Sequence, residues 1–304
     1  MKSLPKRFRD PRVIGEGALG IVYEAWDQVR KEHVALKTLH KASPGAIRDF
    51  KREFRAVADV SHENLVVLHE LFCQQDLWFF TMELVQGEPL LGGSRVSGVP
   101  QLPVDVLRRQ LVQLARGISA LHQIGVIHRD IKPQNVLVEA VGRVVLLDYG
   151  MATSAPNPGA SWDATFAGSP GYVAPELVFG ESLSLASDWY SFGCVLYEAL
   201  TGVLPFEDGA GAILMRKLFR DPTPPSRLAA GVPADLEQLC MALLDREPGR
   251  RPDAQAVMLE LGDDQPVSRP RVIPSSPPSP PGPRVFVGRG EERQQIRAWL
   301  ERGP

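Results

Sequence analysis

Acids, bases and amides cluster in one eight-residue stretch of the chain, His128–Asn135. It reads His-Arg-Asp-Ile-Lys-Pro-Gln-Asn and follows the apolar run Gly125–Ile127, and a second acid, Asp148, follows the apolar run Val144–Leu147. An apolar run that ends in polar residues is typical of a buried strand that delivers a loop into a functional site. Two ordinary hairpin strands with polar ends would have the same pattern, so the two stretches alone do not establish a site.

The polar residues of these stretches have the types needed to transfer a phosphoryl group. Asn135 and Asp148 offer oxygen ligands for Mg²⁺, which usually binds a few carboxylates together with substrate phosphates. Asp130 then remains free to orient and deprotonate a hydroxyl group, and Lys132 can neutralise charge on the transferred phosphate. We expect His128 to be a packed core residue, because a single histidine among carboxylates does not make a metal site.

A glycine-rich loop lies upstream, where phosphate transfer needs one. Residues Gly15–Val22 read G-x-G-x-x-G-x-V, a pattern that dinucleotide-binding folds share in part. In those folds the loop opens a helix, whereas the β-branched Ile21 and Val22 predict that a strand follows here. We therefore expect a hairpin whose backbone amides lie over phosphates, with an ordinary glycine hairpin as the plainer alternative.

A lysine, Lys37, follows this loop in the apolar run Val34–Lys37. Ala35 and Lys37 lie on one face of the predicted strand, which would place a small side chain beside an adenine and an ammonium group beside phosphates. An unpaired charge in an apolar run is costly, so Lys37 needs an acid. Glu53, on an amphipathic helix predicted over 45–60, is the best candidate, and a solvent-facing glutamate is its plainer interpretation.

The elements that position these residues divide into a strand-rich part and a helical part. Up to about Leu84 the pattern predicts the helix and five strands, at 12–14, 21–26, 33–39, 65–68 and 78–82. The later part predicts helices from Pro103 onward, at about 187–201 (apolar nearly all round), at 234–244 and at 253–261. A small strand-rich part before a larger helical part implies two lobes and a cleft between them.

Composition excludes several classes of function. The 304 residues carry 34 basic and 36 acidic side chains, so no overall field favours nucleic acid or an anionic membrane. The N-terminus has no signal peptide, and no apolar run is long enough to span a membrane. The three cysteines, Cys73, Cys194 and Cys240, lack metal-ligand spacing and lie in apolar contexts. We expect them to be reduced core residues of a cytoplasmic protein.

The C-terminal stretch differs in composition from the rest. Residues 266–283 contain eight prolines among eighteen residues, so we expect 263–283 to be a semi-extended linker and not a packed element. The following stretch, 284–304, opens with Arg-Val-Phe-Val-Gly-Arg and resembles the beginning of AAA-type or related signalling ATPase domains. An unrelated strand and helix would give a similar sequence pattern. If the resemblance holds, the chain is the N-terminal part of a longer regulator.

In the order and spacing of its motifs, the chain from Phe8 to Leu261 resembles the eukaryotic-type protein kinases, specifically the bacterial Ser/Thr kinases. The resemblance implies an α+β bilobal fold over 1–262, with a small β-rich N-lobe (about 8–84) containing one main helix and a larger helical C-lobe (about 85–262). It implies ATP and Mg²⁺ as cofactors. The implied catalytic residues are Asp130, which acts as the base, Lys132, and Lys37, which pairs with Glu53. Asn135 and Asp148 would bind the metal. The implied ATP-binding residues are Ile14, Gly15, Glu16, Gly17, Ala18, Leu19, Gly20, Ile21, Val22, Ala35, Lys37, the gatekeeper Met82, and the hinge residues Glu83 and Val85.

The resemblance also implies how the substrate side of the site is built. The stretch that contains Lys132 is similar to the corresponding stretch of Ser/Thr kinases. Arg129 would bind a phosphate on the activation loop, and Glu176 of Ala-Pro-Glu would pair with Arg251. The implied substrates are proteins bearing Ser or Thr, this chain included by autophosphorylation, in bacterial signal transduction. One departure is Tyr149, where the family usually has Phe, because its hydroxyl needs a buried partner. Candidate phosphate acceptors are Thr153, Ser154, Ser161 and Thr165, of which Thr165 and Ser161 are favoured.

Two other functions remain open at this level. The chain could be a non-catalytic nucleotide-binding scaffold, although the intact set of polar residues favours catalysis. It could also phosphorylate small molecules, although 168–176 suggests a platform for a peptide. The sequence names no protein substrate, activating signal or oligomeric state.

Overall fold

The computed structural model describes most of the chain up to Val272. The described residues are 4–17, 20–39, 44–74, 77–92, 101–149, 170–178, 180–181, 183–206, 217, 219–263 and 270–272, except the side chains of Gly17, Pro44, Asp49, Arg52, Glu53 and Ala56. The chain divides into two compact units, 1–273 and 274–304. Every residue described below lies in the first unit, and the predicted ATPase-like stretch lies outside the described residues.

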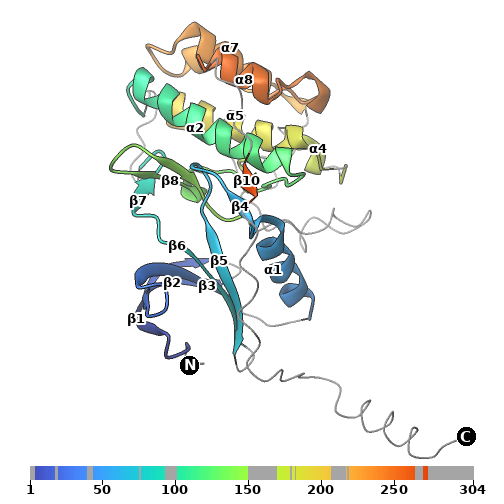
Figure 1. The fold of residues 1–304 in the computed structure, drawn as a ribbon. Coiled ribbons are helices and arrows are strands. Elements are labelled where there is room, and N and C mark those ends of the chain that lie inside the picture. The colour runs from blue at the N-terminus through green and yellow to red at the C-terminus, as the bar shows by residue number, and fades with distance from the viewer. Residues whose placement is uncertain are drawn as a thin grey trace, which may run out of the picture. The chain divides into compact units, whose positions relative to one another are not determined.

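The N-terminal part is built on a five-stranded antiparallel sheet with the strand order β1-β2-β3-β6-β5 (Figure 1). The strands are β1 (Phe8–Gly17), β2 (Gly20–Asp27), β3 (Glu32–Thr38), β6 (Leu77–Glu83) and β5 (Leu68–Gln74). Apolar residues of β1, β3 and β6 bury one face. The helix α1 (Pro44–Val57) packs near the other face through Phe50, whose ring centroid lies 5.0 Å from that of Phe80. The sequence therefore predicted the sheet, its glycine hairpin and its helix correctly.

One strand begins later in the chain than the sequence predicts. The pattern places a strand over 65–68, but β5 runs Leu68–Gln74, and Leu65 forms only an isolated parallel bridge with Leu146. Val66 N–H donates to the Leu146 carbonyl at 3.1 Å. The backbone before β5 therefore bonds to the C-terminal part of the fold, to β9 (Val144–Leu146), and this tertiary pairing overrides the local pattern.

The C-terminal part is mainly helical. Its helices are α2 (Val104–Gln123), α4 (Pro175–Val178), α5 (Leu185–Thr201), α7 (Ala234–Leu243) and α8 (Ala254–Glu260), with short 3₁₀ turns at Pro133–Asn135, Pro225–Arg227 and Pro248–Arg250. A three-stranded sheet, β7 (Gly87–Pro89), β8 (Val136–Glu139) and β9, lies at its edge. The predicted combination of a small strand-rich part and a larger helical part is confirmed.

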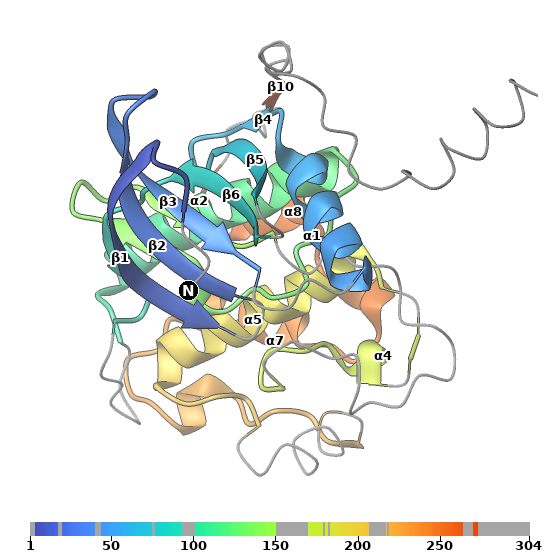
Figure 2. The same ribbon diagram turned by 90° about the horizontal axis from the view of Figure 1, so that it is seen from below.

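The helix α5 is the central element of the helical part. Every residue from Ser187 to Thr201 is buried, as the all-round apolar sequence predicts. A reciprocal capping box between Ser184 and Ser187 starts the helix, and Gly202 ends it in the left-handed region, with φ 75°. It packs against α2 and α7 (Figure 2). This buried helix gives the neighbouring loops a rigid base.

Two further expectations are wrong. The proline-rich stretch was expected to be unpacked, yet β10 (Arg271–Val272) pairs antiparallel with β4 (Val60–Ser61), and Figure 1 shows the two side by side. Arg271 and Val272 are not prolines, so both keep the N–H groups that a ladder needs. The helix α1 was predicted to reach residue 60 but ends at Val57, and Val60 pairs with Val272 instead. Cys194 and Cys240 are buried free thiols, whereas Cys73 is exposed, because it lies on the outer face of β5.

Candidate active site

The stretch His128–Lys132 is a loop whose backbone is hydrogen-bonded to Asp188 of α5. The sequence predicts a strand over 125–127, but no strand is found there, because Gly125 N–H and Val126 N–H donate to the carbonyls of His122 and Leu121 at the end of α2. His128 N–H and Arg129 N–H each donate to a carboxylate oxygen of Asp188, at 2.8 Å. Arg129 adopts φ 72°, which is costly for a residue with a side chain. The two hydrogen bonds to the fully buried Asp188 offset that cost.

His128 joins the loop to the segment that carries Asp148. Its side chain is fully buried, and Nε2 lies 2.8 Å from the Leu147 carbonyl oxygen. The expectation of a packed core histidine is therefore confirmed. The hydrogen bond fixes the two acid-bearing segments against each other.

Asp130, Lys132 and Asn135 form one connected group. Lys132 Nζ lies 2.7 Å from Asp130 Oδ2, and Asn135 Nδ2 donates to the same oxygen at 2.8 Å. Asn135 Nδ2 also donates to the Asp130 backbone carbonyl at 2.7 Å. The 3₁₀ turn Pro133–Asn135 brings Asn135 back to Asp130 over five residues. These contacts fix the carboxylate of Asp130 and engage only its Oδ2.

Lys37 contacts Asp148 across the two parts of the fold. Lys37 Nζ donates to Asp148 Oδ1 at 2.7 Å, and Lys37 is only 5% exposed. Burial raises the pKa of Asp148, but the charge and hydrogen bond of Lys37 outweigh it and hold the pKa below its usual range. The predicted partner of Lys37, Glu53, has a side chain outside the described residues, so that pairing stays a prediction.

The hydroxyl of Tyr149 has the buried hydrogen-bond partner that it requires. The ring is 2% exposed, and the hydroxyl donates to the Val66 carbonyl at 2.7 Å. Burial raises the pKa of Tyr149 well above its ordinary value, so the hydroxyl keeps its proton. The residue after Asp148 is thereby attached to the segment that precedes β5.

Asn135 and Asp148 suit a hard cation. Asn135 contacts Asp130 through its amide nitrogen, which leaves the amide oxygen as a ligand, and Asp148 contacts Lys37 through Oδ1, which leaves Oδ2. In the part of the chain that the structure describes, no group of three or more His, Cys, Asp or Glu residues could hold a metal ion. Two oxygen ligands fit Mg²⁺, which takes its remaining ligands from phosphates and water.

The sheet places the predicted nucleotide-binding residues around Lys37. Lys37 lies opposite Val22 and Phe80, and Ala35 lies opposite Met82. Gly20 must be glycine, because an added Cβ would lie 1.6 Å from the Thr38 carbonyl oxygen. Ala18 and Leu19 lie outside the described residues. The other predicted ATP-binding residues are described, with Ile14, Gly15, Glu16 and Gly17 in β1, Ile21 in β2, Glu83 at the end of β6, and Val85 just after it. Their role in binding ATP stays a prediction.

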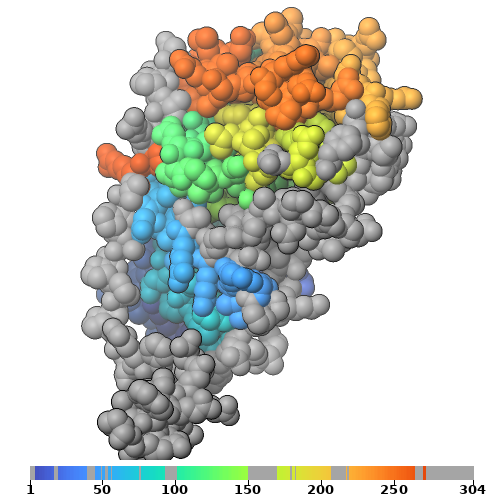
Figure 3. All heavy atoms as spheres, turned by 90° about the vertical axis from the view of Figure 1, so that its right-hand side faces the viewer, coloured from blue at the N-terminus to red at the C-terminus, as the bar shows by residue number. Residues whose placement is uncertain are grey.

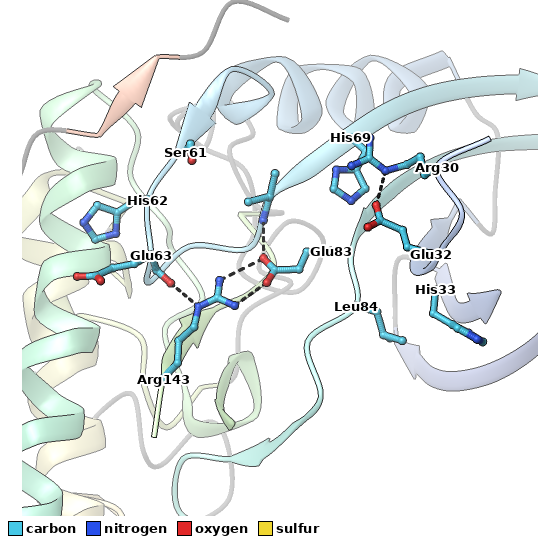
Figure 4. A pocket seen from close by; sticks show the side chains of 11 residues that line it. Arg30, Glu32, His33, Ser61, His62, Glu63, His69, Glu83, Leu84 and Arg143 are labelled. Carbon is cyan, nitrogen blue, oxygen red and sulfur yellow. Dashed lines mark hydrogen bonds and ion pairs between the residues drawn. The ribbon is translucent and has the colours of Figure 1, made fainter. Parts of the chain in front are cut away.

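The side chain of Glu83 does not point toward a nucleotide. Arg143, which the sequence analysis missed, binds both of its oxygens, at 2.5 and 3.2 Å, and Val67 N–H donates to one of them at 3.3 Å. These groups line a pocket of about 460 Å³ together with His62, His69 and others (Figure 4). Only the backbone of Glu83 is therefore available for ATP. No sequence signal links Arg143 to Glu83, because the two lie sixty residues apart.

The segment before and within α4 is attached firmly to the helical part. Arg251 donates to both oxygens of Glu176, at 2.8 and 2.7 Å, and the pair is almost fully buried. This confirms the pairing that the sequence resemblance implied. Tyr172 donates to the buried Glu198 at 2.6 Å. The proposed phosphate acceptors, Thr153, Ser154, Ser161 and Thr165, lie outside the described residues.

Comparison with known proteins agrees with this geometry. Residues 8–260 match the family described as protein kinase domain. The chain is 32% identical over 254 residues to a probable serine/threonine-protein kinase of Clostridium perfringens, covering 82% of this chain and 37% of the relative. It is 31% identical to serine/threonine-protein kinase PrkC of Bacillus subtilis, covering 82% and 39%. It is 32% identical over 298 residues to serine/threonine-protein kinase PknA of Mycobacterium tuberculosis, covering 93% and 67%.

The first two of these relatives are much longer than the matched region, so the chain spans less than two fifths of their length. Within the part of the chain that the structure describes, no helix is both long and apolar enough to cross a membrane.

Proposed function

The chain belongs to the protein kinase family, and from this membership we propose that it transfers the γ-phosphate of ATP to serine and threonine hydroxyls of proteins. The observation that carries the proposal is the group around Asp130, with Lys132 Nζ at 2.7 Å and Asn135 Nδ2 at 2.8 Å from one carboxylate oxygen. The names of the relatives support serine and threonine as acceptors.

Asp130 acts as the base for the attacking hydroxyl. Lys132 and Asn135 both bind Oδ2, so Oδ1 is the oxygen left to orient the hydroxyl and to accept its proton. Lys132 also places a positive charge beside the site of transfer, where it offsets charge that develops on the phosphoryl group. Most of the rate enhancement then comes from positioning and electrostatic stabilisation, because phosphoryl transfer needs little covalent chemistry from the protein.

ATP and Mg²⁺ complete the site. Asn135 and Asp148 would hold the metal through the oxygens that their protein contacts leave unused. When bound, the metal neutralises charge on the phosphates. Lys37 changes partners in this proposal: its ammonium group, now on Asp148, binds the α- and β-phosphates and pairs with Glu53. The glycine hairpin of β1 and β2 covers the nucleotide.

We place the reaction in the cytoplasm, where ATP is available and where buried thiols such as Cys194 stay reduced. The substrates are proteins that carry serine or threonine, this chain included, in bacterial signal transduction. The stretch 284–304 would lead into an ATPase-like region of a longer chain.

The direct test is incorporation of label from γ-labelled ATP with Mg²⁺ into the chain itself and into myelin basic protein. Asp130→Asn keeps the shape of the side chain and removes the base, so incorporation should fall at least about a hundredfold. Asp105→Asn is the matched control, because Asp105 is an exposed acid near the start of α2. Equal incorporation by Asp130→Asn and the control would contradict the proposal. Nucleotide binding with no transfer to any protein would favour the scaffold function instead.

A further inference from the structure

A fully buried lysine lies beneath the segment that precedes α4. Lys217 is 1% exposed, and its ammonium nitrogen donates to three backbone carbonyls, those of Pro170 at 2.9 Å, Gly171 at 2.8 Å and Val173 at 2.7 Å. An ammonium group has three N–H donors, so these contacts use all of them. The sequence analysis did not single out Lys217, because its partners lie more than forty residues earlier in the chain.

The segment 170–173 has no secondary structure to satisfy its own carbonyls. It forms a turn that leads into Ala174 and α4, and Figure 2 shows it beside α5. The helix α5 also contacts the segment, since Ser191 Oγ donates to the Tyr172 carbonyl at 2.9 Å and the Tyr172 hydroxyl donates to Glu198. Lys217 therefore supplies the donor for the other three carbonyls of these four consecutive residues, those of Pro170, Gly171 and Val173.

Among the described residues, no acid forms a direct ion pair with Lys217. Its nitrogen lies 5.3 Å from the ring centroid of Tyr190, and Arg251 lies 4.9 Å from the same ring. Burying an ammonium group costs free energy of desolvation, and the three hydrogen bonds to backbone carbonyls must offset that cost. Lys217 and the Arg251–Glu176 pair thus fasten the segment at two points, one before and one inside α4.

We propose that Lys217 is a positioning residue that holds the backbone of 170–173 in the shape that receives the protein substrate. The inference rests on the proposed kinase function and extends it to the peptide side of the site. The segment belongs to the part of the 168–176 platform that the structure describes, in which Pro170 and Val178 are half-buried and the residues between them are buried. In Figure 3 the helical part, coloured green to orange, lies above the blue N-terminal part. Lys217 itself touches no substrate, so loss of the amine should weaken substrate binding and leave ATP binding unchanged.

The same contacts make the segment sensitive to alkaline pH. Burial lowers the pKa of Lys217 from 10.5 to about 8, and it does so against the opposing influence of Cys194 and Glu176. Burial raises the pKa of Cys194 to about 11, so that thiol stays neutral. Burial also raises the pKa of Glu176, but Arg251 outweighs it and holds that pKa below its usual range, so Glu176 stays charged. Above pH 8 the neutral amine has two donors for three carbonyls, so the KM for a protein substrate should rise between pH 7 and pH 9.

Two measurements on the whole chain test this, with Lys217→Met as the variant and Lys6→Met, at an exposed lysine, as the control. The first is hydrogen–deuterium exchange of the amides in 170–178, which needs no catalysis. The second is steady-state kinetics with myelin basic protein and with ATP as the varied substrate. Lys217→Met removes all three hydrogen bonds, so it should speed exchange in the segment and raise the KM for the protein at least about tenfold, since about 1.4 kcal/mol is already tenfold. The KM for ATP should stay unchanged.

The pH profile separates positioning from a purely structural role. The wild type and Lys6→Met should both show the rise in protein KM between pH 7 and pH 9, and Lys217→Met should not. Unchanged exchange in the variant would overturn the proposal, and so would faster exchange with an unchanged protein KM. If even the wild type transfers no phosphate, the proposed function fails, while the exchange measurement still decides whether Lys217 holds the segment.

Discussion

A single buried carboxylate, Asp188, organises the catalytic loop. It accepts hydrogen bonds from His128 N–H and Arg129 N–H and lies 2.8 Å from His122 Nε2. Asp188 is fully buried, so each of these contacts is made at low dielectric, where hydrogen bonds to a charged acceptor are strong. The carboxylate thereby fixes the left-handed backbone at Arg129, which immediately precedes Asp130.

Asp188→Asn should lower both the stability of the fold and the activity that depends on Asp130. The amide can accept only through one oxygen, so one of the two backbone N–H groups loses its acceptor. We expect the free energy of unfolding to fall by about 3 kcal/mol and phosphotransfer to fall with it. Urea denaturation and labelled-ATP incorporation measure the two effects. Unchanged stability would show that the loop does not depend on Asp188, and Asp105→Asn serves as the exposed control.

Tyr149→Phe should cost stability and spare activity. The substitution removes only the hydroxyl that donates to the Val66 carbonyl at 2.7 Å and leaves the ring packed. We expect the free energy of unfolding to fall by about 1 kcal/mol, the usual net contribution of a buried hydrogen bond. Phosphotransfer should stay within about twofold of the wild type, since the hydroxyl contacts no reacting group. A large loss of activity with unchanged stability would assign the hydroxyl a role beyond packing.

At the scale of elements, α5 requires close approach to its neighbours. A Cβ added at Gly193 would lie 2.8 Å from the Leu243 Cβ of α7 and 3.3 Å from Leu244 Cδ2. Glycine is otherwise unfavourable inside a helix by about 1 kcal/mol relative to alanine. The absence of a side chain is therefore required by packing, and α7 sets that requirement.

Gly193→Ala should lower the free energy of unfolding by about 1–3 kcal/mol, because overpacking against α7 outweighs the gain in helix propensity. Gly249→Ala is the matched control, since an added Cβ there meets no atom within 4 Å, and it should leave stability nearly unchanged. Thermal or urea unfolding of both variants provides the comparison. A stabilised Gly193→Ala variant would mean that helix propensity, and not helix packing, decides at this position.

The sequence predicts elements whose signal is local and misses those fixed by distant partners. The buried α5 and the hairpin at Gly15–Val22 follow from apolar periodicity and glycine spacing. The expected strand at 125–127 fails, because Gly125 N–H and Val126 N–H donate to the carbonyls of His122 and Leu121 at the end of α2. The loop that follows it is held by Asp188, sixty residues later in the chain. Lys217 was missed for the same reason. In the site, the acids and their neighbours were predictable by type and spacing, whereas their hydrogen-bond partners were not.

At the scale of the molecule, ion pairs connect parts of the chain that are far apart in sequence. Arg7 binds Asp27 and Glu70, and Arg116 binds Asp263 at 2.8 and 2.9 Å. Burial raises the pKa of Asp27, but Arg7 and two backbone N–H groups lower it below its ordinary value. A carboxylate with a depressed pKa stabilises the fold above its unfolded pKa, and this contribution is lost as the pH falls through the folded value. The contribution of Asp27 is therefore lost only when the pH falls below the ordinary carboxylate range.

Two histidines should govern stability at milder acidity. Burial lowers the pKa of both His62 and His69 below the ordinary value of 6.5. His62 Nδ1 also accepts a hydrogen bond from Asn64 N–H at 3.1 Å, which requires that nitrogen to be unprotonated. Below pH 6.5 the unfolded chain takes up protons that the folded chain does not, so the free energy of unfolding should fall as the pH drops from 6.5 toward the lowered folded values.

The double variant His62→Gln, His69→Gln tests this assignment by urea unfolding at pH 7.5 and pH 5.5. The wild type should lose stability between the two values, and the double variant should lose clearly less, because it lacks both buried proton acceptors. At pH 7.5 both histidines are neutral, so the difference between the two proteins there measures packing alone and serves as the internal control. An equal loss in both proteins would place the titrating groups elsewhere in the fold. Both side chains line the pocket beside Glu83 (Figure 4), so the same protonation would place positive charge next to the hinge.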